Sequence, residues 1–398
     1  MYLNIGIDVS KNKHDACILN ENGEQIGKFM KLTNTRTSLD KFLEQIKIIS
    51  EKHGAEVRIG LEATGIYWYS LFSKISDDHK ISIYNPTQIH AFAKVNVRGS
   101  KTDKIDAKTI ANMLRFGNAP QTDYSDKQRL ELREYVRFHW KLTNNKTNLK
   151  KRFKRNLHLV FPGYDQVFKD VFTKTSREIL SQSPTPDDIL EMGEGKLLEL
   201  MKKASRNHID KEKARELIVK AEDTIPSEIL KESSLFELQI MMEMIENLEK
   251  HIDTLENKIF AIWDKVKDKH YIQTITGISE FRAAMIWAEI GDINNFTHPD
   301  QIVAFAGLDP KVRKSANKEV IGGPNKRGSS TLRWALGWAV QESKNVNPVL
   351  APYFKKKIAE GKHYNTARCA ASKKLIRIIW SVEKNKKPFQ IPSNLQSS

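Results

Sequence analysis

An apolar repeat in the third quarter of the chain constrains the fold more than any other feature. Apolar residues recur at alternating spacings of three and four over about four heptads: Leu238, Met241, Ile245, Leu248, Ile252, Leu255, Ile259, Ile262 and Val266. This spacing predicts a long helix with one apolar seam, as in a coiled coil. Either a second copy of the chain buries the seam, giving a dimer or tetramer, or an internal helical hairpin packs on residues 162–230.

The N-terminal residues have the pattern of a mixed α/β sheet. The expected strands are Tyr2–Val9, Asp15–Asn20, Gln25–Leu32, Glu56–Leu61 and Lys80–Tyr84. The first three are separated by polar turns and predict an antiparallel meander, whereas helical patterns at Ser38–Lys52 and from Tyr67 surround the fourth. A meander followed by β-α-β suggests an RNase H-like sheet.

The charge of the chain points to a polyanionic partner. The formal net charge is +16, and it is concentrated in residues 126–160, with 11 Lys and Arg against 3 acids, and residues 311–377, with 16 against 3. Clustered cations bind a phosphate backbone by releasing its counterions, so we favour nucleic acid over a solvated charged face. The expected contact residues are Arg98, Lys101, Lys104, Lys150, Lys151, Arg152, Lys154, Arg155, Arg313, Lys314, Lys318, Lys326 and Arg327.

Other classes of protein are disfavoured. The sequence contains no run of roughly 20 apolar residues that could span a membrane, and its start lacks the pattern of a signal peptide. Cys17 and Cys369 are the only cysteines and lie far apart, so they form neither a disulfide framework nor a metal-binding pair. We expect a cytoplasmic protein without a membrane partner.

Four acids have positions that suit catalysis. Asp8 ends the first strand, Glu62 follows the strand VRIGL, and Asp103 and Asp106 share one face at a helix start. Converging carboxylates repel one another unless divalent cations neutralise them, and oxygen ligands suit Mg²⁺ or Mn²⁺. Two such ions can cleave a phosphodiester. Taken singly, each acid is more simply explained as a surface group or, for Asp103, as a helix N-cap.

Three further motifs each have two interpretations. The opening IGIDVSKNKHDACIL also suits the first phosphate loop of an actin-like kinase, but we find no later Gly-rich adenosine loop. GGPNKRGSS at 322–330 is either a phosphate-binding turn, through backbone N–H groups, Lys326 and Arg327, or a plain surface turn. TITGIS at 274–279 resembles the hairpin of a helix-hairpin-helix that grips a nucleic-acid backbone, or is a packing turn.

Together, GIDVSKNKHDACIL, GLEATGIYW and RGSKTDKIDAKTIANML resemble the insertion-sequence 110 (IS110) family of DEDD transposases. The C-terminal segment from TITGISEFRAAM to GGPNKRGSSTLRWAL is similar to that family's second domain. The resemblance implies an α/β, RuvC-like nuclease domain at 1–160, a helical coiled-coil region for oligomerisation at 161–268, and a mostly α-helical C-terminal transposase domain at 269–398.

The resemblance also implies roles for residues and partners. Asp8, Glu62, Asp103 and Asp106 correspond to the family's metal ligands, and Ser315 to its nucleophilic serine, although Ala316 stands where the family usually has Gly. Alone, a serine in a basic loop is more simply a hydrogen-bond donor. Members of the family choose DNA sites by pairing with a structured bridge RNA, so both nucleic acids are expected partners.

We therefore expect a transposase or recombinase that cuts and rejoins DNA. Two alternatives remain: a junction resolvase that uses the acids and water, and a nucleic-acid-binding protein without catalysis. Recombination by Ser315→Ala at the wild-type rate would favour the resolvase. A lack of Mg²⁺-dependent affinity or cleavage would favour the binding protein.

Overall fold

The computed structural model describes residues 2–391 except 64, 77, 94–102, 118–126, 207, 209–210 and 316–317, and the side chains of these residues except 87 and 312–321. The chain separates into two compact units. Residues 132–269 form one unit, and the residues up to 131 together with those from 270 onward form the other. In the described part of the chain, we find no helix that is long and apolar enough to cross a membrane.

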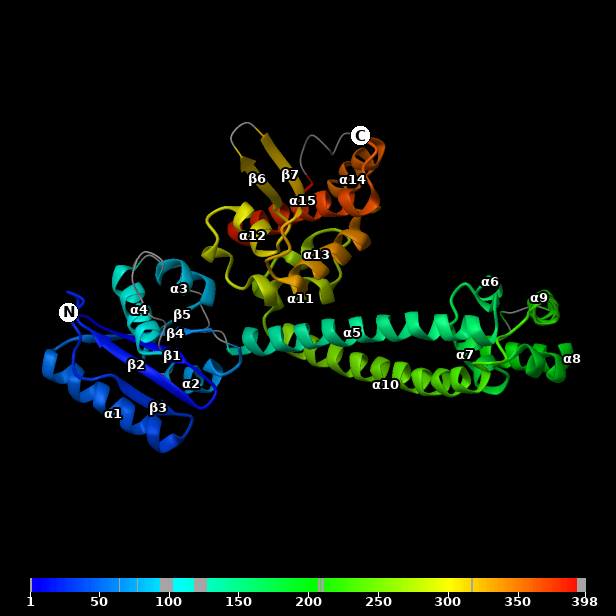
Figure 1. Ribbon diagram of the computed structural model, residues 1–398. Coiled ribbons are helices and arrows are strands. Elements are labelled where there is room, and N and C mark those ends of the chain that lie inside the picture. The colour runs from blue at the N-terminus through cyan, green and yellow to red at the C-terminus, as the bar shows by residue number, and fades with distance from the viewer. Residues whose placement is uncertain are drawn as a thin grey trace. The chain divides into compact units, whose positions relative to one another are not determined.

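A five-stranded mixed sheet forms the N-terminal domain (Figure 1). Its strands are β1 (Tyr2–Val9), β2 (Lys13–Leu19), β3 (Met30–Thr33), β4 (Glu56–Glu62) and β5 (Lys80–Tyr84). They lie in the order β3-β2-β1-β4-β5, with β1, β2 and β3 antiparallel and with β4 and β5 parallel to β1. The expected meander and β-α-β unit are confirmed, and this arrangement is compatible with an RNase H-like sheet.

Helices cover both faces of this sheet. They are α1 (Arg36–His53), α2 (Trp68–Ile75), α3 (Pro86–Ala93) and α4 (Asp103–Phe116). Side chains alternate across a strand, so Ile5 and Ile7 of β1 point to one face, where they form a core with residues of α1 and α2. Gly6 points to the other face, where α4 lies.

The third strand begins later than expected. β3 starts at Met30, whereas the sequence pattern placed a strand from Gln25. Gly23 and Gly27 both have positive φ, 86° and 71°, which are turn conformations that interrupt a strand. The apolar residues between them and β3 therefore belong largely to an irregular connection.

A long helical hairpin forms the second unit. Its helices are α5 (Lys127–Val160, which begins in the first unit), α6 (Tyr164–Val167), α7 (Lys174–Gln182), α8 (Pro186–Ser205), α9 (Lys211–Glu222) and α10 (Lys231–Trp263). α5 and α10 lie side by side and antiparallel (Figure 1), since residues that come later in α5 bond to residues that come earlier in α10. His139 Nε2 lies 2.9 Å from Glu256 Oε1, and Asn156 donates to Glu237 at 2.6 Å.

The heptad seam is buried inside the chain. Leu238, Met241, Ile245, Ile252 and Leu255 are each at most 7% exposed. The first three belong to one core with residues of α5 and of the short helices α6 to α9. The packing is thus that of the intramolecular alternative, with α5 as an additional partner beside residues 162–230. Self-association through this region stays a prediction.

From residue 270 onward the chain is mostly helical. The elements that follow are η1 (Lys267–Lys269), η2 (Ile272–Thr274), α11 (Glu280–Ile290), η3 (Ile293–Asn295), α12 (Pro299–Phe305), β6 (Pro310–Ser315), β7 (Lys318–Pro324), α13 (Ser330–Ser343), α14 (Leu350–Ala359) and α15 (Tyr364–Asn385). α11 and α13 contribute many alanines to the core, and small side chains let helices approach closely. Glu383 of α15 accepts hydrogen bonds from the backbone N–H groups of Tyr271 and Ile272, which ties η2 to the last helix.

Candidate active site

Two of the predicted acids lie on neighbouring strands. β1 and β4 pair in parallel, with Gly6 opposite Gly60 and Ile7 opposite Leu61. Asp8 and Glu62 come next in this register, near the ends of their strands, and both are partly exposed. Each lies two residues after a glycine that faces α4, so both side chains emerge on the face that α4 covers.

Glycine allows α4 to lie directly on the sheet. A Cβ atom added at Gly6 would lie 2.1 Å from the carbonyl oxygen of Ala107 and 2.3 Å from the backbone nitrogen of Ala111. At Gly60 it would lie 2.8 Å from Cγ2 of Ile110. Any side chain at Gly6 would meet helix backbone, which cannot rotate away. This contact brings the first turn of α4, which carries the other two acids, over the strand ends.

The pKa of Asp8 shows how closely the acids gather. Burial raises it most, and the charges of Glu62, Asp106, Asp103 and Asp15 raise it further, to about 7. Among the residues whose side chains are described, no three His, Cys, Asp or Glu side chains lie close enough together to hold a metal ion as they stand. The structure therefore brings the four predicted acids within electrostatic reach of one another, but not to the spacing of metal ligands.

Lys13 and the hydrogen-bonded loop that precedes it lie next to the acids. Lys13 Nζ lies 3.3 Å from Asp103 Oδ2 in an ion pair whose side chains are both more than half exposed. The loop between Asp8 and Lys13 is fixed by the buried side chain of His14, whose Nδ1 accepts from Ser10 N–H and whose Nε2 lies 2.7 Å from Asn34 Oδ1. These contacts hold the start of β2 in place beside the acids.

Asp15 is an acid that the sequence analysis did not select. It lies directly across the antiparallel pair from Asp8 and is 4% exposed. The turn of this hairpin is centred between residues 11 and 12, which places residues 8 and 15 at equal distances from it. Pairing the two strands about their polar turn would have identified it from the sequence.

The cations predicted to contact nucleic acid in the first half of the chain differ in exposure and in the groups that they contact. Arg98 and Lys101 lie outside the described residues. Lys104 lies 5.6 Å from the ring of Phe29. On α5, Lys150 is partly buried and pairs with Glu249 at 3.1 Å. The other four predicted contacts on that helix are exposed: Lys151, Arg152, Lys154 and Arg155.

Ser315 is the last residue of β6 and pairs in register with Lys318 of β7. The side chains of Ser315, Arg313, Lys314 and Lys318 lie outside those that the structure describes. What the structure establishes here is an antiparallel hairpin, with the predicted nucleophile at the end of its first strand. The predictions about these side chains stay predictions.

The segment after β7 is held by its own backbone. Asn325, Lys326 and Ser329 donate their N–H groups to the carbonyls of Asp309, Gly307 and Phe305, at 2.8, 3.1 and 2.7 Å. These three donors are therefore engaged within the protein. Lys326 has a φ of 60°, which is uncommon for a residue with a side chain, and both it and Arg327 are exposed. The exposed side chains of Lys326 and Arg327 remain candidate phosphate contacts of this segment.

The TITGIS turn is packed against α13. A Cβ atom at Gly277 would lie 2.8 Å from Cα of Ser343, and the amide of Asn347 donates to the Thr276 carbonyl at 2.8 Å. These contacts are those of the packing turn, one of the two interpretations. Binding of a nucleic-acid backbone by this turn stays a prediction.

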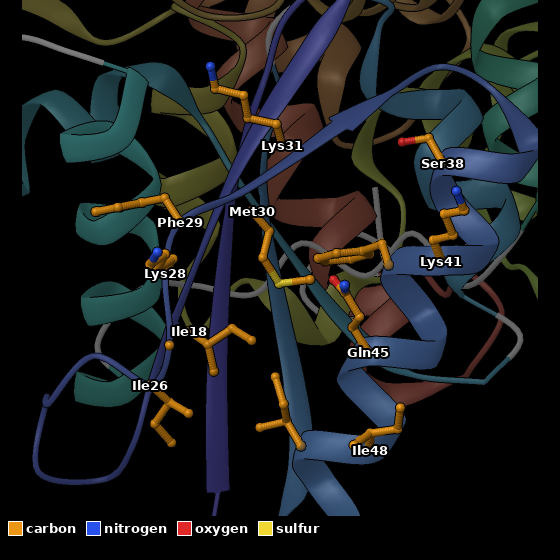
Figure 2. Close-up of a pocket in the computed structure, with 13 residues that line it drawn as sticks. Ile18, Ile26, Lys28, Phe29, Met30, Lys31, Ser38, Lys41, Gln45 and Ile48 are labelled. Atoms are coloured by element: carbon orange, nitrogen blue, oxygen red, sulfur yellow. The ribbon is translucent and has the colours of Figure 1, made fainter.

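A cavity of about 600 Å³ lies elsewhere on the N-terminal domain, between α1 and the segment that leads into β3. Figure 2 shows Ile18, Met30 and Gln45 around it, with Lys41 at its rim on α1. None of its lining residues is one of the predicted acids. The predicted acids therefore lie outside this cavity.

Comparison with known proteins identifies two matching regions. A family model described as "Transposase", for DEDD transposases of IS110 elements, matches residues 5–162, and the model "Transposase IS116/IS110/IS902 family" matches residues 269–355. The pilin gene-inverting proteins of Moraxella lacunata and Moraxella bovis are each 40% identical over 119 residues, which is 29% of this chain and 35% of each relative. The transposase for insertion sequence element IS1111A of Coxiella burnetii is 31% identical over 140 residues, 34% of this chain and 38% of the relative.

The chain spans somewhat more than a third of the length of these relatives. The first family model covers the sheet with its acids and α5, and the second covers the β6–β7 hairpin, whose first strand ends in Ser315. The chain belongs to the IS110 family of transposases.

Proposed function

We propose that this protein is a DNA transposase or recombinase that cuts and rejoins phosphodiester bonds with a divalent-cation site on an RNase H-like sheet. The observation that carries the proposal is the gathering of Glu62, Asp103 and Asp106 around the partly buried Asp8, where burial first and these charges second raise the pKa of Asp8 to about 7. Carboxylates so placed are unfavourable without a cation and favourable with one. The names of the relatives, a gene-inverting protein and a transposase, agree with DNA rearrangement.

The donor set fits Mg²⁺ or Mn²⁺. Asp8, Glu62, Asp103 and Asp106 offer only carboxylate oxygens, the ligands that hard divalent cations prefer. Partly exposed side chains at strand ends and in the first turn of a helix can rotate toward a shared ion. When bound, two cations would stabilise the attacking and leaving oxygens of an in-line displacement at phosphorus.

The nucleophile that we propose is the hydroxyl of Ser315. Its oxygen forms a bond to the phosphorus of the DNA backbone, one ester bond between that phosphorus and a sugar oxygen breaks, and the serine proton ends on the released sugar oxygen. The reverse reaction, with the sugar hydroxyl of another DNA end, rejoins the backbone and frees the serine. This exchange conserves the number of ester bonds and needs no energy source.

Partners are proposed on the same basis. Four exposed cations near the C-terminal end of α5 form a surface for the phosphates of DNA or of a structured guide RNA: Lys151, Arg152, Lys154 and Arg155. Lys326 and Arg327 are a second pair of exposed cations, on the C-terminal domain. A dimer or tetramer would let acids and serine of different copies meet at one DNA site.

Loss of the acids tests the cation site. With junction DNA carrying matched element ends, the protein should recombine DNA in Mg²⁺, and Asp8→Asn should abolish this activity and weaken Mn²⁺ binding. Asp40→Asn serves as the matched control, because Asp40 is an exposed acid on α1. Undiminished recombination by Asp8→Asn would overturn the proposal.

Covalent trapping tests the serine. Denaturing a reaction on labelled DNA should leave label attached to the protein, and Ser315→Ala should lose both this label and recombination. Ser181→Ala, an exposed serine of α7, is the control. If Ser315→Ala recombines at the wild-type rate, the serine step is wrong. If it instead cuts junctions without rejoining them, the protein is a resolvase that uses water.

A further inference from the structure

The cross-strand pair of Asp8 and Asp15 is unusual for a sheet. The two residues are partners in the antiparallel register of β1 and β2. Directly opposite residues point to the same face, with Cβ atoms about 4.5–5.5 Å apart, and like charges in this position are destabilising. Because Asp8 emerges on the face that α4 covers, Asp15 does so as well. The next residue of β2 on that face, Cys17, packs with Ala107 and Ala111 of α4.

Burial makes the position of Asp15 costly. The residue is 4% exposed, whereas Asp8 is partly exposed. In the part of the chain that the structure describes, no group makes a hydrogen bond or ion pair with the Asp15 carboxylate. The interaction that the structure gives this carboxylate is the repulsion with Asp8. Solvent still reaches its oxygen atoms, which are not among the fully buried polar atoms without a partner. Low exposure next to a second acid nevertheless disfavours the charged carboxylate unless a cation binds it.

The cations near Asp15 belong to three elements. Lys31 of β3 is its register partner on the other side, but is exposed and makes no ion pair with it among the described contacts. Lys13 of β2 pairs with Asp103. Lys104 of α4 lies over the ring of Phe29. The competing explanation is that Lys31 neutralises Asp15 through water.

We propose that Asp15 belongs to the divalent-cation site, where its carboxylate helps to hold the ion that binds at Asp8. The inference rests on the proposed function and extends it, because the site then contains five acids. Five carboxylates offer enough oxygen ligands to hold a pair of divalent cations.

Metal binding by the full chain tests this inference without reference to activity. Asp15→Asn keeps the shape of the side chain, and we expect it to weaken Mn²⁺ binding in calorimetric titration by about 10- to 100-fold. In EDTA the variant should melt at a higher temperature than wild type, because the repulsion with Asp8 is gone. Lys31→Ala should bind Mn²⁺ as wild type does.

A double-mutant comparison keeps the result interpretable. If Asp8 and Asp15 hold the same ion, Asp8→Asn with Asp15→Asn should lose less affinity than the two single losses added together. Wild-type Mn²⁺ affinity in a folded Asp15→Asn variant overturns the inference. The inference also fails if Lys31→Ala lowers the melting temperature strongly in wild type but not in the Asp15→Asn background, because Lys31 would then be the partner of Asp15. Failure of wild type itself to bind Mn²⁺ would instead overturn the proposed function.

Discussion

Replacement of Gly6 by alanine offers a sharp test of how the fold builds the site. The added Cβ would lie 2.1 Å from the carbonyl oxygen of Ala107, whereas ordinary contacts begin at 3.4 Å, so helix and strand must separate by about 1.3 Å. The obstacle is helix backbone, which cannot change rotamer. α4 must therefore move, and it carries Asp103 and Asp106 away from Asp8.

The expected effects follow from this displacement. Overpacking of this kind destabilises a protein by about 1–3 kcal/mol, and misplacement of reacting groups by roughly 1 Å lowers activity by about 100-fold. Recombination of junction DNA in Mg²⁺ should fall by that factor at a temperature where circular dichroism shows the variant folded. Gly195→Ala is the control, because a Cβ there meets nothing within 4 Å. Wild-type activity in folded Gly6→Ala would refute the reasoning.

Three further predictions concern stability. Without divalent cations, the raised pKa of Asp8 makes the contribution of Asp8 to folding stability complete below about pH 3.8, and this contribution is lost as the pH rises through about 7. Asp8→Asn should therefore stabilise the protein in EDTA at pH 8 by on the order of 1 kcal/mol, allowing for solvent screening, and have less effect at pH 5; equal effects at both would argue against it. Glu383→Gln weakens the hydrogen bonds that two backbone N–H groups donate to this side chain, and it should cost about 1–3 kcal/mol of stability. We expect faster amide exchange in η2, and unchanged exchange would contradict the role of Glu383 in holding η2 to α15. Ile245→Ala on the buried seam should destabilise the hairpin by about 2–5 kcal/mol, and Met244→Ala, on a residue 48% exposed, by much less. Similar urea midpoints for these two variants would show that α10 buries another face.

The sequence predicted the N-terminal sheet well because each strand has a local signature. Strand-end acids, polar turns and apolar runs place β1, β4 and β5 nearly to the residue. β3 was misplaced because backbone conformation at Gly23 and Gly27, rather than hydropathy, decides where that strand begins. A pattern of apolar residues cannot report φ.

Partners in space were harder to predict than elements. The heptads specify that α10 has an apolar seam, but not that much of its cover is α5 of the same chain, because hydrophobic contact is non-directional. In the same way, the four acids follow from strand ends and a helix start, whereas Asp15 requires the register of the hairpin. The role of Lys150 depends on Glu249, a residue far away in the sequence.

The central claim is that acids from β1, β4 and α4 share divalent cations. A crystal structure of the full chain soaked in Mn²⁺, with anomalous scattering to locate the metal, tests it most directly. The account predicts anomalous peaks between Asp8, Glu62, Asp103 and Asp106, at roughly 2 Å from their carboxylate oxygens. Mn²⁺ bound elsewhere, with these four side chains turned away from one another, would contradict it.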